Sequence, residues 1–136
     1  MDTTQAISSY LFIVDKPKNA FTEPALLQLS HIYYSQENYS EAIEKYALLE
    51  NITETKSNLL IARIGLLRST YKLKEYAQTI NIANKIFYTD KVSDEVKREA
   101  RYKMAYAYFG LNQINDALSE FRKLAQDVSN EEGAES

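Results

Sequence analysis

The sequence predicts an all-α protein, because three observations agree on helices. Apolar residues recur three and four positions apart, as in Leu26, Leu29, Ile32 and Tyr33. No segment keeps the alternation of apolar and polar residues that indicates a strand. Both prolines lie in the first quarter of the chain, so the helices after them meet few breaks.

Seven helices are expected, each carrying one apolar stripe and separated from the next by a short polar turn. Their expected ranges are 2–14, 22–36, 39–50, 55–73, 75–88, 92–111 and 113–128. The stripes are, in order, Ala6/Tyr10/Ile13, Leu26/Leu29/Tyr33, Ala42/Tyr46/Leu49, Ala62/Leu66, Ile80/Ala83/Ile86, Met104/Ala107/Tyr108 and Ala117/Phe121/Leu124.

One pattern recurs along the chain. A small residue stands at positions 42, 79 and 117, spacings of 37 and 38 residues. Each is preceded three positions earlier by a large apolar residue and followed directly by Ile or Leu. The first helix enters the same frame at Ala6, 36 residues before Ala42. Recurrence at a fixed period predicts a repeat protein built from two-helix units.

The pattern resembles the tetratricopeptide repeat, a helix–turn–helix unit of about 34 residues. The matching residues are Leu29, Ser30, Tyr33, Tyr39, Ala42 and Tyr46 in the first full repeat, and Met104, Ala105, Tyr108, Ile114, Ala117 and Phe121 in the third. The middle repeat departs from the pattern at Leu67 and Thr70. The longer spacing and the link 16–21 resemble a bacterial envelope subgroup, which includes the Tol–Pal coordinator and the lipoprotein of the outer-membrane barrel-assembly machinery.

The resemblance implies a right-handed α-α superhelix, a tetratricopeptide solenoid of about 3.5 repeats. Residues 1–136 would form a single domain, with 2–14 as the second helix of a truncated repeat and three repeats at 22–51, 55–88 and 92–128. Because neither end carries an evident polar cap, the chain is expected to be an internal segment of a longer array, with adjacent repeats as neighbours. The alternative is a short protein that forms homo-oligomers through its exposed ends.

Composition excludes several kinds of chemistry. The 136 residues include no cysteine, one histidine and three dispersed glycines, which removes thiolate sites, two-His metal sites and glycine-rich phosphate loops. No cofactor and no metal are therefore expected. A net charge of −3 argues against nucleic acid as a partner. No apolar run approaches the roughly 20 residues of a membrane helix, so membrane insertion by this segment is not expected.

The resemblance also implies a binding surface, because first helices of such repeats line a concave face. The inward positions expected to bind a protein or peptide partner are His31, Tyr34, Arg68, Tyr71, Lys72, Tyr102, Lys103, Tyr106 and Phe109. Aromatic rings beside basic side chains suit an extended or helical segment of acidic and apolar character. The alternative is that these aromatics pack between adjacent first helices and contact no partner.

Three functions stay open from the sequence. The first is a non-enzymatic interaction scaffold, and the second is a structural spacer or homo-oligomerisation module. The third is a helical hydrolase with an acidic pair, which is disfavoured because Glu99 is almost the only carboxylate on the inner rows. The resemblance implies a bacterial periplasmic or outer-membrane location, with the cytoplasm as the alternative.

Overall fold

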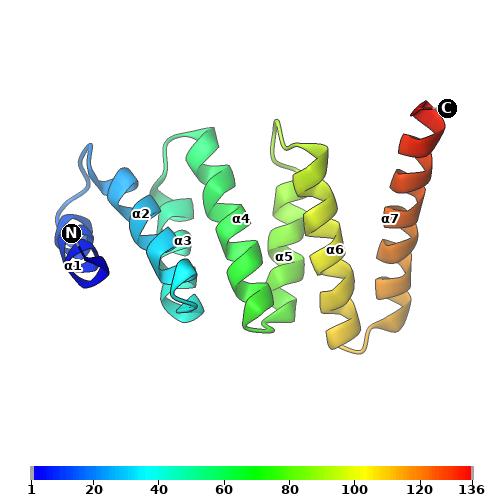
Figure 1. The fold of residues 1–136 in the computed structure, drawn as a ribbon, viewed down its shortest axis with the longest axis horizontal. Helices are drawn as coiled ribbons and strands as arrows, with labels where there is room; N and C mark the ends of the chain where they lie inside the picture. The colour runs from blue at the N-terminus through cyan, green and yellow to red at the C-terminus, as the bar shows by residue number, and fades with distance from the viewer. Residues whose placement is uncertain (1, 136) are drawn as a thin grey trace. The chain divides into compact units, whose positions relative to one another are not determined.

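The protein is all-α: a computed structural model describes the backbone of residues 2–135 and the side chains of residues 2–127. Seven helices and no strand occur in this part of the chain (Figure 1). The helices are α1 (Thr3–Val14), α2 (Thr22–Ser35), α3 (Tyr39–Ile52), α4 (Lys56–Lys72), α5 (Tyr76–Phe87), α6 (Asp94–Gly110) and α7 (Ile114–Glu135). The predicted all-α fold class and the predicted number of helices are therefore confirmed.

Side-chain caps explain why three of the helices begin where they do. Asp2, Thr55 and Ser93 precede α1, α4 and α6, and each side-chain oxygen accepts a hydrogen bond from the backbone N–H three residues later. The first turn of a helix has backbone donors without helical acceptors, so such a cap stabilises the start.

The turns that end α2, α4 and α6 repeat with the period of the sequence. Glu37, Lys74 and Asn112 adopt left-handed backbone conformations, with φ of 60°, 59° and 61°. Their spacings are 37 and 38 residues, the same as those of the small residues in the repeated pattern. The same backbone hydrogen bond of 2.9 Å closes the turns at Glu37 and Asn112. In each turn the N–H of the residue that follows the left-handed residue donates to the carbonyl five positions before it. These three turns therefore recur with the spacing of the sequence pattern, whereas Lys91, with a φ of 58°, is left-handed outside that spacing.

The chain divides into two compact units, Met1–Leu73 and Lys74–Ser136, which are described separately. A single domain over residues 1–136 stays a prediction. None of the described helices combines the length and apolarity needed to cross a bilayer.

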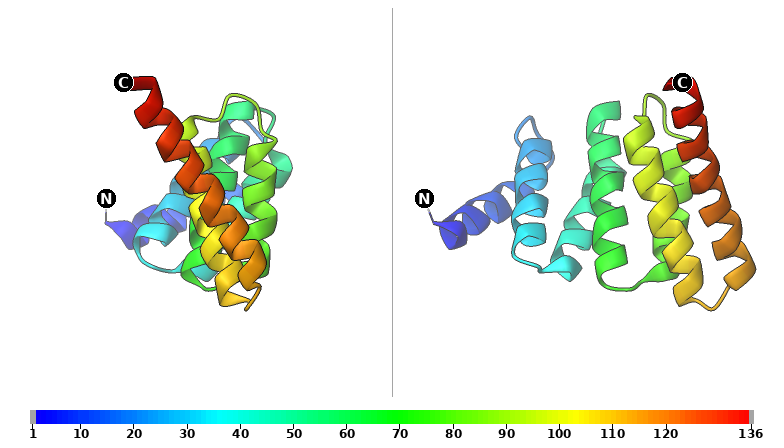
Figure 2. Two further views of the ribbon diagram at one scale, coloured as in Figure 1. Left: turned by 90° about the vertical axis from the view of Figure 1, so that its right-hand side faces the viewer. Right: turned by 45° about the vertical axis from the view of Figure 1, so that its right-hand side comes forward.

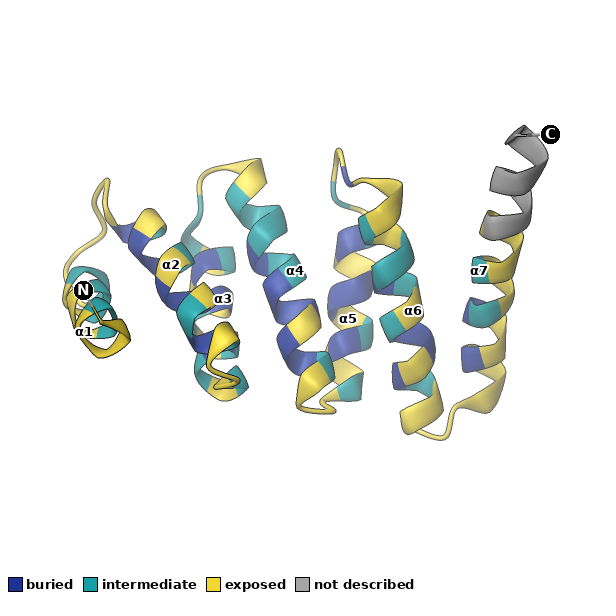
Figure 3. Cartoon of the chain, viewed as in Figure 1, coloured by how far each residue is buried: buried dark blue, intermediate teal, exposed yellow. Residues whose placement is uncertain are grey.

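In the first unit, each helix packs on the next along the chain. α1 packs on α2, α2 on α3 and α3 on α4, with a smaller contact between α2 and α4. The core forms where Leu26, Leu49 and Ala62 meet from α2, α3 and α4. Figure 3 shows buried residues along α2, α3 and α4, whereas α1 has none and in the described residues packs on α2 alone.

In the second unit, α6 packs on both α5 and α7, and Figure 2 shows α6 and α7 side by side. Arg101 links the three helices. Its guanidinium lies 4.6 Å from the centre of the Phe87 ring and forms a 2.6 Å ion pair with the largely buried Glu120 of α7. The apolar core is built mostly from small side chains, which allow close approach of the helices: Ala83, Ala100, Ala105, Ala107 and Ala117.

Candidate functional site

The structure distributes the predicted binding residues over the two units. His31 and Tyr34 lie on α2, and Arg68, Tyr71 and Lys72 lie on α4, all in the first unit. The other four lie on α6 in the second unit: Tyr102, Lys103, Tyr106 and Phe109. Each set is therefore considered on its own.

His31 is engaged by its own unit. Its Nδ1 lies 2.7 Å from the Tyr46 hydroxyl, and the two rings meet edge to face at 5.8 Å. Tyr46 is only 2% exposed, and burial raises its pKa to about 12. We assign the Tyr46 hydroxyl as the donor and Nδ1 of the neutral imidazole as the acceptor. Burial lowers the pKa of His31, which agrees with this assignment.

This pair predicts a pH dependence of stability. The pKa of His31 in the folded chain lies below its ordinary value of 6.5, so the unfolded chain binds the proton more readily. Because burial is the cause of the lowered pKa, the stability that comes from keeping the imidazole neutral is fully present above pH 6.5, declines as the pH falls below it and levels off below the folded-state pKa. Urea denaturation between pH 7.5 and 5.5 should show this decline, and His31→Gln should flatten it. His31 is the sole histidine, so no second imidazole obscures the result. If the free energy of unfolding of the variant changed with pH as steeply as that of the unaltered chain, the assignment of a neutral His31 would be contradicted.

Among the predicted binding residues of the first unit, the two tyrosines on α2 and α4 are partly covered, whereas the two cations on α4 are exposed. Tyr34 is half-buried and meets Tyr39 of α3 edge to face, with ring centres 5.3 Å apart. Tyr71 on α4 is likewise half-buried. Arg68 and Lys72 lie exposed on the same helix. The contact of Tyr34 with Tyr39 is a packing contact within the protein, which agrees with the alternative that these aromatic residues pack internally and do not bind a partner.

The α6 residues are far more accessible. Tyr102, Tyr106 and Phe109 are 48%, 41% and 59% exposed and occupy successive turns of one helix face. The Tyr102 and Tyr106 rings lie 4.8 Å apart. Lys103 is half-buried and forms an ion pair of 3.2 Å with Glu99. We call Tyr102, Tyr106 and Phe109 the α6 aromatic row.

Sequence reasoning missed the apolar residues of α7 beside this row. Phe121 meets Tyr106 edge to face at 5.1 Å, and Ile114 and Leu118 are exposed on the same helix. The spacing of 114, 118 and 121 is that of one helix face, a signal the sequence contained. The prediction considered first helices only, so it left out the second helix of the pair.

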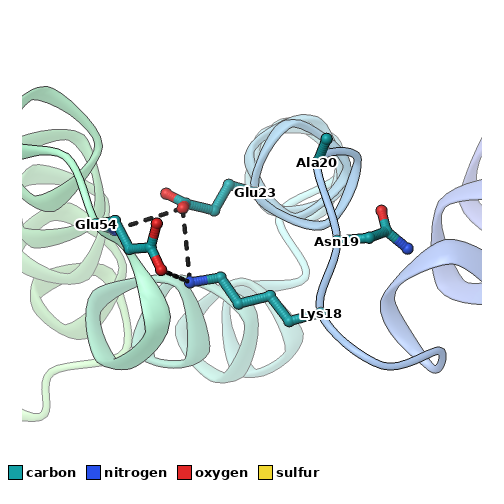
Figure 4. A pocket seen from close by; sticks show the side chains of 5 residues that line it. All are labelled: Lys18, Asn19, Ala20, Glu23 and Glu54. Atoms are coloured by element: carbon teal, nitrogen blue, oxygen red, sulfur yellow. Dashed lines mark hydrogen bonds and ion pairs between the residues drawn. The ribbon is translucent and has the colours of Figure 1, made fainter.

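A polar hollow of about 320 Å³ lies elsewhere in the first unit, lined by Lys18, Asn19, Ala20, Glu23 and Glu54 (Figure 4). Lys18 Nζ donates to the Ile52 carbonyl at 2.6 Å and pairs with Glu54 at 3.2 Å. The Glu23 carboxylate accepts hydrogen bonds from Thr53, from Asn58 and from the Glu54 N–H. The Lys18 contacts join the α1–α2 link to the end of α3 and the α3–α4 link, and the Glu23 contacts join the first turn of α2 to the α3–α4 link and to α4.

The charged side chains in this hollow bond to the protein itself, so their role is structural. Hydrogen bonds to Glu23, first among them the one from the Thr53 hydroxyl, lower its pKa. A general acid needs a raised pKa, so Glu23 is unsuited to that role. Among the described residues, no three His, Asp or Glu side chains gather as metal ligands would.

Comparison with known proteins leaves the chain without a family assignment. No protein-family model matches it, and no solved structure matches it.

Proposed function

We propose that this chain is a non-enzymatic protein-interaction module built from tetratricopeptide-like helix pairs. The turns at Glu37, Lys74 and Asn112 support it, because their left-handed conformation recurs at the spacing of the sequence pattern. The packing in the first unit also supports it, since among the described residues α1 packs on α2 and on no other helix, as in an open stack and unlike a closed four-helix bundle. The right-handed superhelix and a bacterial envelope location belong to this proposal and rest on the resemblance.

The observation that carries the binding function is the exposure of the α6 aromatic row. Three large aromatic side chains on successive turns of one helix form an apolar surface that water covers at a cost. Tyrosine and phenylalanine bury much area at little loss of side-chain entropy, which makes them effective anchors for a partner. The row belongs to the first helix of the third repeat, the helix that the resemblance assigns to the concave face.

Selection of peptides tests this function. A phage-displayed random peptide library is selected on the full chain, and the affinity of an enriched peptide is measured. Phe109→Ala should weaken binding at least about tenfold, and Tyr102→Ala with Phe109→Ala should weaken it further. Tyr88→Ala is the matched control, because Tyr88 is an exposed aromatic residue of the same unit outside the row. If these substitutions left the affinity of the enriched peptides unchanged, binding at the α6 aromatic row would be refuted.

Turnover assays address the enzyme alternative separately. A panel of hydrolase substrates should show no turnover by the full chain. Turnover that survives purification and disappears on Glu99→Gln would replace the binding function by a catalytic one, since Glu99 lies on α6 beside the row.

A further inference from the structure

The α2–α3 pair of the first unit and the α6–α7 pair of the second unit are equivalent in the repeat. Both pairs are joined through a left-handed residue, Glu37 in one and Asn112 in the other. The edge-to-face contact of His31 with Tyr46 in the first corresponds to that of Tyr106 with Phe121 in the second. The helix that covers the α2–α3 pair therefore indicates what kind of helix fits the α6–α7 pair.

In the first unit, α4 covers the pair. Ala62 of α4 packs against Leu49, and Arg63 forms an ion pair of 3.1 Å with Glu50. Gly65 lies directly against the Tyr46 ring, where an added Cβ would overlap the ring atoms. Two small residues three positions apart thus let the α4 backbone approach α3, and Tyr46 and Leu49 become almost fully buried.

In the second unit, no other helix of the described residues covers the equivalent face. Phe121 and Leu124 stand at the positions of Tyr46 and Leu49, yet both are only half-buried. Leu118, which stands at the position of Ile43, is 45% exposed. Within its unit, the described part of α7 packs on α6 alone. We call Tyr106, Ile114, Leu118, Phe121 and Leu124 the α6–α7 face.

We propose that the α6–α7 face is a docking site for an amphipathic α-helix of a partner, which packs there as α4 packs on α3. The helix would carry two small residues three positions apart on its apolar side, because Phe121 is about as bulky as Tyr46 and the partner backbone must come close to it. Ala125 stands where Glu50 pairs with Arg63, so the contact needs no basic residue there and is mainly apolar.

This inference rests on the proposed function and specifies its partner. The α6 aromatic row forms one edge of the face through Tyr106, and the α7 residues form the rest. An amphipathic helix in an apolar groove is a common mode of peptide recognition, with anchors on one side of the helix. The chain itself thus supplies a model ligand, the sequence of α4.

The test uses a dye-labelled peptide with the sequence of residues 55–73, bound to the full chain and followed by fluorescence anisotropy. A hydrocarbon staple between positions 68 and 72, both exposed in the unit, keeps the peptide helical, since a free peptide of this length is barely helical. We expect saturable binding with one peptide per chain. Replacing the glycine at position 65 of the peptide by phenylalanine should abolish it.

Two variants of the protein locate the contact. Leu118→Lys places a charge in the middle of the face and should weaken binding at least about tenfold. Leu48→Lys is the matched control: Leu48 is an exposed leucine on the second helix of its pair, and it should leave the affinity unchanged. If Leu118→Lys left the affinity of the peptide unchanged, the inference would be overturned, because the peptide would then bind elsewhere on the chain.

Two further outcomes also decide the matter. Concentration-dependent self-association of the full chain that Leu118→Lys removes would mean that a second copy covers the face, and would overturn the partner helix. A stapled peptide that fails to bind, while library peptides still bind through Phe109, would refute this inference and leave the proposed function standing.

Discussion

Leu49→Ala is expected to lower the free energy of unfolding of the first unit by about 2–5 kcal/mol, whereas Leu124→Ala should lower that of the second unit by about 1 kcal/mol. The two leucines occupy the same repeat position, but Leu49 is fully buried under α4 and Leu124 is half-exposed. Removing Leu49 leaves a cavity lined by Leu26 and Ala62, which the packed helices cannot close.

Urea denaturation measures both changes, and hydrogen exchange followed by mass spectrometry assigns them to α2–α4 or to α6–α7. Leu48→Ala on the outer side of α3 is a control that should cost well under the amount lost at Leu49, because Leu48 is partly in solvent. Equal losses at Leu49 and Leu124 would mean that both faces are covered alike, against the burial seen in the two units.

The helices could be predicted closely because their signals are local. Six of the seven expected ranges match α1–α6 to within two residues at either end. The start of α6 was expected at 92 and lies at Asp94, after the Ser93 cap. The last helix was expected to end at 128 and continues to Glu135. Its C-terminal sequence lacks an apolar stripe, and a stripe shows where a helix is buried rather than where it ends.

The candidate site was less predictable, because exposure depends on neighbours far along the sequence. Repeat spacing places His31 and Tyr106 at equivalent positions, and the sequence itself shows that Tyr46 has a hydroxyl and Phe121 has none. What the sequence does not show is that the His31 side chain reaches the Tyr46 hydroxyl. The apolar face of α7 could be predicted from its spacing, but its exposure could not, because apolar residues at helical spacing are usually core.

Gly65→Ala is expected to destabilise the first unit by about 1–3 kcal/mol, although alanine favours helices over glycine by about 1 kcal/mol. A Cβ at position 65 would overlap the Tyr46 ring, and that ring is held by burial and by His31. The new methyl group therefore forces α4 away from α3 or moves the ring out of its place. Urea denaturation again provides the measurement.

Two comparisons make the cause of this loss visible. In a Tyr46→Leu background the obstructing ring is gone, so Gly65→Ala should become neutral or stabilising by up to about 1 kcal/mol, the helix preference alone. Gly110→Ala would also meet a ring, that of Tyr76, but Gly110 ends α6 at the surface and Tyr76 is only half-buried. Because the Tyr76 ring is less buried than the Tyr46 ring, we expect the cost at Gly110 to be well below that at Gly65. A loss at Gly65 that persists without Tyr46 would show that something other than the ring opposes the methyl group.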